Sequence, residues 1–236
     1  PLEAQWTMEP RWASAYVLGA DSGAKSTSPV RLNANVQRLA IARGEGPLLP
    51  SVFDLDAHVT SPSAELTTPK GERIALQTID VKARRADAPG AVAFDASVAR
   101  VDGPGGAGSV TAKGEVANIA DGQGRLTTDA AVLDLRLDGT FPTALVDILA
   151  DTDSTLQDLL GATVRAEVQA DDFSRTGGTL RAAADAPRAD ANLRGEVKDG
   201  AFVSAEPATA RITEITREFS AKAIEPLIPI LAKFEK

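Results

Sequence analysis

The sequence predicts a mainly β protein, built on a long, twisted antiparallel sheet with short helices near residues 142–160 and at the C-terminus. Apolar and polar residues alternate over most of the chain, which is typical of strands that bury one face and wet the other. Turns rich in Gly, Pro and Asp separate these runs at short spacing. A convincing internal helical period is confined to residues 140–161. Together these observations favour an antiparallel meander over a fold of alternating strands and helices.

The clearest strand pattern begins at Val30. Four apolar residues there alternate with polar ones, which places them on one face of a sheet: Val30, Leu32, Ala34 and Val36. Leu39 and Ile41 continue the pattern one step out of phase. The slip at residues 37–38 predicts a β-bulge or a bend, which strongly twisted sheets use to curve.

Alternating apolar residues predict further strands on both sides of the helical stretch. These strands are expected within residues 53–59, 74–83, 92–98, 110–116, 126–137, 164–168, 180–184, 189–197 and 208–212. Near the N-terminus we expect an opening strand through Trp12, Ala15 and Val17. Residues 61–71, which include Pro62, are expected to interrupt the strand pattern. Because alanine is frequent and aromatic residues number only ten, we expect a shallow core spread over an extended surface.

Residues 140–161, TFPTALVDILADTDSTLQDLLG, predict two short helices. Thr140 suits the N-cap of the first helix and Pro142 its first turn, whereas Gly161 suits the C-terminal stop of the second helix. We expect the apolar stripes of both helices to form a lid over one end of the sheet: Leu145, Ile148, Leu149, Leu156, Leu159 and Leu160. A broken helix is expected over residues 213–236, because prolines interrupt its apolar spacing.

The chain carries a formal net charge of −8 at pH 7, with its charged residues dispersed. No basic patch is visible, so nucleic acid is not expected as a partner. The absence of cysteine excludes disulfides and thiolate metal sites. No apolar run has the length of a membrane-spanning helix, and no signal peptide is visible. The strand pattern predicts a single elongated domain, residues 1–236. Because the sequence starts at Pro1 without an initiator Met, we expect it to be a piece cut from a longer or processed protein.

None of the motif-like stretches supports a catalytic or metal site. GPGGAG at residues 103–108 has the spacing of a dinucleotide motif, but a strand pattern rather than a helix follows it, which predicts a hairpin turn. His58 is the single histidine and alternates toward solvent. The acidic pairs within residues 151–153 and 171–172 lack the ligand spacing of a cation loop and suit caps and turns. We therefore expect a non-enzymatic protein with no catalytic residues, no metal and no cofactor.

Three stretches and the alternating Ala, Val and Leu strands carry a family resemblance over residues 30–234. The stretches are LDLRLDGTFPTALVDIL (133–149), LLGATVRAEVQA (159–170) and SRTGGTLRAAADAPRADANLRGEVKDGAF (174–202). They resemble the AsmA-like proteins of diderm bacterial envelopes, relatives of TamB and of the bridge-like lipid-transfer proteins. The resemblance implies a taco-shaped sheet whose concave apolar face holds lipid acyl chains and whose convex face is polar.

The same resemblance implies a periplasmic or cell-envelope location in a diderm bacterium and neighbouring β repeats of the same protein as partners. The chain lacks the N-terminal membrane anchor common in the family, so membrane contact is expected only through parts outside this sequence. No catalytic residues follow from the resemblance.

The leading hypothesis is a non-enzymatic lipid-binding or lipid-conducting module with acyl chains on the apolar face. Its expected lining residues are Val92, Phe94, Val98, Val110, Val116, Leu133, Leu135, Leu137, Val164, Val168 and Leu193. The alternative is a structural or adhesive β module, a sandwich or solenoid spacer with a closed core and no ligand. Small residues such as Ala182 and Ala191 favour such a tight closed stack. A hydrolase would need a cleft with clustered carboxylates, and the sequence gives no reason to expect one.

Overall fold

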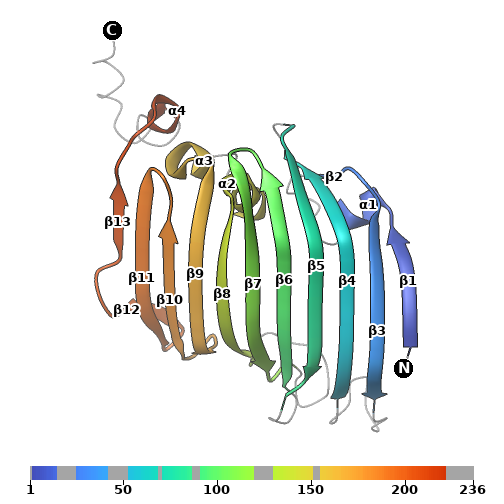
Figure 1. Ribbon diagram of the computed structural model, residues 1–236. Helices are drawn as coiled ribbons and strands as arrows, with labels where there is room; N and C mark the ends of the chain where they lie inside the picture. The colour runs from blue at the N-terminus through green and yellow to red at the C-terminus, as the bar shows by residue number, and fades with distance from the viewer. Residues whose placement is uncertain are drawn as a thin grey trace.

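The computed structural model describes residues 2–14, 25–41, 53–68, 71–86, 91–119, 130–150 and 155–221. Thirteen strands in these ranges form one antiparallel sheet that does not close on itself (Figure 1). The strands are β1 Leu2–Met8, β2 Lys25–Ser26, β3 Val30–Ile41, β4 Phe53–Thr67, β5 Arg73–Arg85, β6 Val92–Gly103, β7 Gly106–Ala117, β8 Val132–Pro142, β9 Thr163–Phe173, β10 Thr179–Asp185, β11 Ala189–Lys198, β12 Ala201–Ser204 and β13 Thr209–Ile212. The predicted fold class is confirmed: the protein is mainly β, and its long open sheet fits a curled shape.

The strands follow one another across the sheet in chain order, as in a meander. β1 pairs with β3, and each later strand pairs with the next as far as β12. Two short strands each share a partner strand with another strand. β2 pairs with β4 beyond the segment of β4 that pairs with β3, and β13 pairs with one part of β11 while β12 pairs with another. The hairpin predicted at residues 103–108 is confirmed, since a two-residue turn joins β6 to β7.

The register separates apolar and polar side chains onto opposite faces of the sheet. Cross-strand partners share a face, and successive residues of one strand point to opposite faces. One row of partners crosses ten strands and is apolar throughout: Ala4, Ala34, Val59, Val81, Ala96, Ala112, Leu137, Val168, Ala182 and Leu193. The adjacent row is polar throughout: Glu3, Asn35, His58, Lys82, Asp95, Lys113, Arg136, Gln169, Arg181 and Arg194. We call the face that carries the first row the apolar face and the other the polar face.

Local irregularities keep the apolar side chains on one face where the sequence slips out of phase. The register of β3 against β4 shifts between Val36 and Arg38, which confirms the bulge predicted there. A similar shift in β6 keeps Val98 and Val101 on the apolar face. In β5 the apolar residues change phase between Leu76 and Ile79, and Thr78, whose φ is 53°, lies at this point. Each irregularity therefore compensates a break in the two-residue period.

The predicted interruption at residues 61–71 is wrong for its first part, because β4 continues through Pro62 to Thr67. A proline has no N–H and is excluded where a neighbouring strand needs that donor. On one side of Pro62, pairing with β3 has ended at Thr60 and pairing with β2 has not begun before Leu66. On the other side, the ladder with β5 passes over Pro62. Pro62 thus lies at a position where no described ladder needs a backbone N–H.

Two further sequence predictions are wrong. Thr140 is not a helix cap, because it is paired on both sides inside β8, and the helix α2 (Thr143–Ala150) begins three residues later. Trp12 lies in the short helix α1 (Pro10–Ala13) rather than in a strand, and β1 precedes it. Residues 126–129, which were predicted to open the strand now assigned to β8, lie outside the described residues.

The helix α3 (Thr155–Leu160) ends at Gly161, as predicted. The φ of Gly161 is 93°, in the left-handed region that glycine adopts without strain. Of the broken helix predicted over residues 213–236, the structure describes the short helix α4 (Arg217–Phe219), and residues 222–236 lie outside the described part of the chain.

The buried core is small and lies at one end of the sheet, where α2 meets it. Its cluster joins strands to α2 through Leu66, Ile74, Val101 and Ala144, with Leu76, Val98, Phe141 and Leu145 packed against them. Ten hydrophobic residues are buried in the described part of the chain, and six of them are alanine. Because alanine buries little apolar area, this core is shallow. Most of the apolar face therefore lies beyond it.

Asp147 joins the two helices of this end. The residue is 6% exposed, and its two carboxylate oxygens accept hydrogen bonds from the backbone N–H groups of Leu156 and Gln157, both at 2.9 Å. These are N–H groups of the first turn of α3, which have no acceptor within their own helix. Asp147 therefore caps α3 from the neighbouring helix.

Replacing Asp147 with alanine is expected to lower the free energy of unfolding by about 1–2 kcal/mol, because two N–H groups lose their acceptor. Urea unfolding followed by circular dichroism measures the change. Asp147→Asn is the matched control, since it keeps one acceptor oxygen and should lose less. Equal stability of wild type and Asp147→Ala would exclude the capping role.

Candidate functional site

All eleven residues predicted to line a lipid site lie on the apolar face. They come from five strands, β6, β7, β8, β9 and β11, and are Val92, Phe94, Val98, Val110, Val116, Leu133, Leu135, Leu137, Val164, Val168 and Leu193. Direct partners such as Val98 and Val110 bring them into one continuous surface. Val164 is buried and the other ten are half-buried. The sheet therefore gathers residues that are up to 101 positions apart in the chain, from Val92 to Leu193.

Large apolar side chains are exposed on this face far from the core. Leu2 is 65% exposed and Trp6 51% exposed on the outer strand β1. At the other edge, Phe202 is 42% exposed on β12 and Ile212 43% exposed on β13. Soluble proteins seldom leave a contiguous apolar patch of more than roughly a few hundred Å² uncovered unless it has a binding role.

Two glycines of the apolar face lie beneath aromatic rings of neighbouring strands. Gly114 lies under the ring of Phe94, because a Cβ built on this glycine would be 2.9 Å from Phe94 Cζ. Gly195 lies under Phe202 in the same way, with a Cβ only 2.4 Å from Phe202 Cζ. Aromatic rings that cover glycines stabilise sheets by shielding the backbone. Both rings lie on the apolar face, where they form part of its surface.

The helices lie at one end of the strands (Figure 1). Of the predicted lid residues, Leu145 packs against the core cluster, and Leu156, Leu159 and Leu160 are half-buried in α3, which contacts β9 and β11. The side chains of Ile148 and Leu149 lie outside the described part of the structure. Within the described residues, the helices therefore meet the apolar face at its end rather than along its length.

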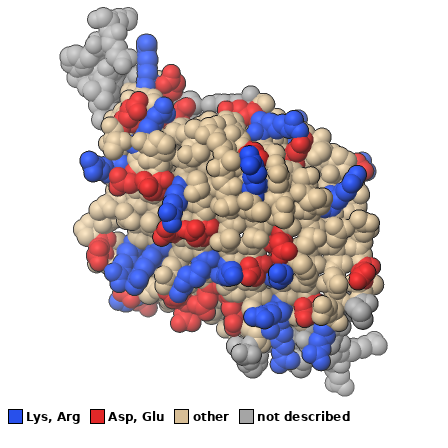
Figure 2. All heavy atoms as spheres, viewed as in Figure 1, with Lys and Arg blue, Asp and Glu red and all other residues tan. Residues whose placement is uncertain are grey.

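The polar face carries charged side chains of both signs (Figure 2). Many are paired across strands, including Lys113 Nζ with Asp95 Oδ2 at 3.1 Å and His58 Nε2 with Asp80 Oδ2 at 2.7 Å. The hydrogen bond from His58 lowers the pKa of Asp80 from its usual 3.8, although partial burial opposes that shift. Exposed pairs of this kind contribute little to stability. The polar face is therefore a solvated surface, and the asymmetry between the faces is the main feature of the sheet.

The Asp80 pair predicts a small dependence of stability on pH. Because folding lowers the pKa of Asp80 below its usual 3.8, its contribution is present above about pH 4 and is lost as the pH falls through the folded pKa. We expect Asp80→Asn to be less stable than wild type at pH 7 by less than about 1 kcal/mol, and this difference to shrink as the pH falls through the folded pKa of Asp80. Urea unfolding over a series of pH values from 7 downward measures it. A difference that stays constant with pH would contradict this role.

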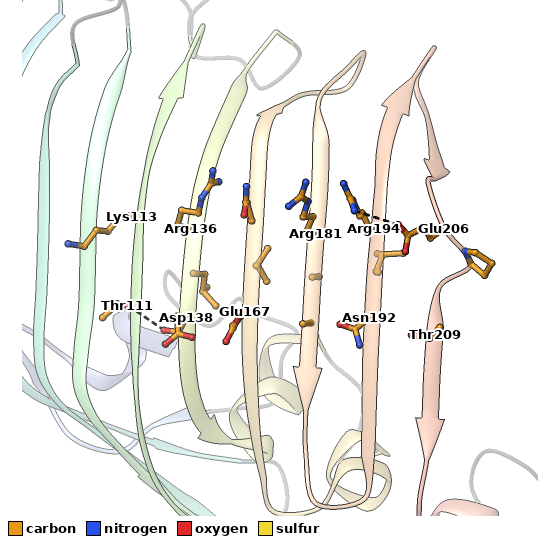
Figure 3. Close-up of a pocket in the computed structure, with 17 residues that line it drawn as sticks. Thr111, Lys113, Arg136, Asp138, Glu167, Arg181, Asn192, Arg194, Glu206 and Thr209 are labelled. Carbon is orange, nitrogen blue, oxygen red and sulfur yellow. Dashed lines mark hydrogen bonds and ion pairs between the residues drawn. The ribbon is translucent and has the colours of Figure 1, made fainter.

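Sequence reasoning missed a hollow on the polar face, with a volume of about 720 Å³ (Figure 3). Its charged lining comes from β7–β11 and the loop after β12: Lys113, Arg136, Asp138, Glu167, Arg181, Arg194 and Glu206. Arg181 and Arg194 are direct partners across β10 and β11. They lie 13 positions apart in the chain, so only the strand register brings them together.

No group of three or more His, Cys, Asp or Glu side chains in the described residues is placed to hold a metal ion. Among the helices that the structure describes, none has the length and apolarity needed to cross a membrane. Comparison of this chain with models of protein families, with curated proteins and with solved structures found no match. The two faces of the sheet are therefore the features of this protein that bear on its function.

Proposed function

We propose that this protein binds lipid acyl chains, or another elongated apolar ligand, on the apolar face of its sheet. The observation that carries this proposal is the apolar row that crosses ten strands, next to a row that is polar throughout. A sheet that only had to stay soluble would need no such face beyond its small core. An acyl chain lying on the face would take the place of water.

The energetics favour a long apolar ligand over a compact one. Burial of each methylene group contributes about 0.8 kcal/mol, so the affinity of a flexible chain grows with the length that lies on the sheet. Neighbouring strands are spaced by about 4.8 Å, so ten strands present a surface more than 40 Å wide. Alanines such as Ala96 and Ala112 leave room for a chain between larger residues. Acyl chains have the matching shape and chemistry.

The biological setting that we propose rests on the resemblance of residues 30–234 to AsmA-like proteins. A lipid-binding sheet of AsmA-like type works in the cell envelope of a diderm bacterium, where it binds or conducts lipid between membranes without catalysing a reaction. The outer strands β1, β12 and β13 each have an unpaired edge among the described strands. Neighbouring β repeats of the same protein are the partners that such edges suit.

Native mass spectrometry of the purified protein, with extraction and identification of co-purified lipid, tests this proposal. We expect bound lipid, or stoichiometric uptake of a fatty acid added to delipidated protein. A protein that neither carries lipid nor takes up a fatty acid would instead favour the structural spacer. In that case the apolar face would have to be covered by the protein itself.

A further inference from the structure

We propose that the polar face binds a phosphate group between Arg181 and Arg194, in the hollow over β7–β11. This site is independent of the acyl-chain surface, because it lies on the opposite face of the sheet. Arg181 and Arg194 occupy directly opposed positions on β10 and β11. Their Cβ atoms are therefore about 4.5–5.5 Å apart, and like charges in this arrangement repel each other. An anion between the two guanidinium groups would convert this repulsion into binding.

The other two cations of the hollow already have carboxylate partners. Lys113 Nζ lies 3.1 Å from Asp95 Oδ2, and Arg136 Nη2 lies 2.5 Å from Asp171 Oδ1. Arg136 also donates from Nη1 to two backbone carbonyl oxygens, at 3.0 and 3.1 Å. These contacts occupy the charge of Lys113 and Arg136, so neither is the centre of the proposed site.

Arg181 differs from these neighbours. No hydrogen bond or ion pair joins its side chain to another residue in the described part of the structure, although it lies near the Asp171 carboxylate. Within the same described residues, the side chain of its partner Arg194 has a single long contact, 3.5 Å from Nη1 to Glu206 Oε1. The two directly opposed arginines therefore keep most of their hydrogen-bonding capacity for a ligand.

The acidic side chains of the hollow do not fill this position. Asp138 and Glu167 lie in the next row of the polar face, and both contact Arg165, at 3.3 and 2.7 Å. In that row, Ala183 stands between Glu167 and Asn192 and leaves open space beside Arg181. Figure 3 shows Arg181 and Arg194 on one side of the hollow, and Asp138, Glu167 and Asn192 on the other.

The chemistry of two adjacent guanidinium groups selects phosphate over a simple carboxylate. Each guanidinium can donate two parallel hydrogen bonds to an oxyanion. A phosphate monoester offers three terminal oxygens and nearly two negative charges, whereas a carboxylate offers two oxygens and one charge. The net charge of −8 disfavours anions at long range, but charges more than about 8 Å away are largely screened at physiological salt. Binding is therefore a local property of the arginine pair.

Calorimetric titration with inorganic pyrophosphate at physiological salt tests the proposal on the full chain. We expect saturable binding to wild type and at least tenfold weaker binding to Arg181→Ala. Arg100→Ala is the matched control, because Arg100 is an exposed arginine of the polar face on β6, outside the hollow and paired with Asp102. Circular dichroism establishes that each variant is folded.

Flotation with phosphatidylcholine vesicles, with and without phosphatidic acid, distinguishes a lipid headgroup from a free phosphate compound. Binding of pyrophosphate alone identifies a free phosphate compound as the source of the phosphate, whereas binding of both probes includes a lipid headgroup. Either result supports the site if Arg181→Ala loses the binding. Absence of saturable binding to both probes would overturn the proposal. Equal loss in Arg181→Ala and Arg100→Ala would overturn it too, since binding would then follow net charge. Neither result would bear on acyl-chain uptake by the apolar face.

Discussion

Replacing Ile74 with alanine is expected to lower the free energy of unfolding by about 2–5 kcal/mol. Ile74 is fully buried at the centre of the cluster that joins β4, β5 and β6 to α2. The deletion removes apolar contacts and leaves a cavity under the helix, in a protein whose described part buries only ten hydrophobic residues. Because a domain of this kind is stable by roughly 5–15 kcal/mol, the loss is a large fraction of the total. Urea unfolding measures it.

Val81→Ala is the control for this prediction, because Val81 lies on the same strand and the same face but is 36% exposed. We expect it to lower stability by less than about 1 kcal/mol, since Val81 is partly exposed and lies outside the core cluster, so the lost methyl groups leave no closed cavity. If both variants lost the same stability, the small cluster under α2 would not be the core of the fold.

Replacing Val110 with aspartate is expected to reduce the capture of a fatty acid at least tenfold, because burial of each methylene contributes about 0.8 kcal/mol and a carboxylate on the apolar face holds water there. Val110 lies between Val98 of β6 and Gly139 of β8, near the middle of the sheet. Thr111→Asp is the matched control. It adds the same charge to the next residue of β7, with a side chain of similar size, on the polar face.

Uptake of a fluorescent fatty acid by the two variants, with circular dichroism as the check on folding, measures this difference. Full uptake by folded Val110→Asp would exclude acyl chains from this part of the sheet. A similar loss in both variants would mean that added negative charge, rather than the face that carries it, decides binding.

The sequence predicted the strands well where their period is two, and it also predicted the bulge after Val36. It did not predict β1, although Leu2, Ala4, Trp6 and Met8 alternate with polar residues; the first strand was expected later, through Trp12. The alternation was the signal that could have found this strand.

Other errors arose from rules that depend on tertiary context. Pro62 was predicted to break a strand, but β4 accepts it at a gap between two partner strands. Thr140 has the residue type of a helix cap, yet pairing with β7 and β9 keeps it in β8. Local sequence contains no information on which partners a segment will meet.

The two candidate sites differ in how far sequence alone could reveal them. The apolar face follows from alternation within each strand, so its lining residues were predictable one strand at a time. The arginine pair depends on the register of β10 against β11, and no local pattern fixes that register. For this reason Arg181 and Arg194 became a candidate site only once the sheet was assembled.

Residue-level mapping with a photoreactive fatty acid tests the acyl-chain surface most directly. Along β8, Leu133, Leu135 and Leu137 belong to the apolar face, whereas Asp134, Arg136 and Asp138 belong to the polar face. After irradiation and peptide mass spectrometry, we expect label on the three leucines and none on the three charged residues, with the same alternation along β7. Label on the charged residues, label without alternation, or no label at saturating fatty acid would contradict acyl-chain binding on the apolar face.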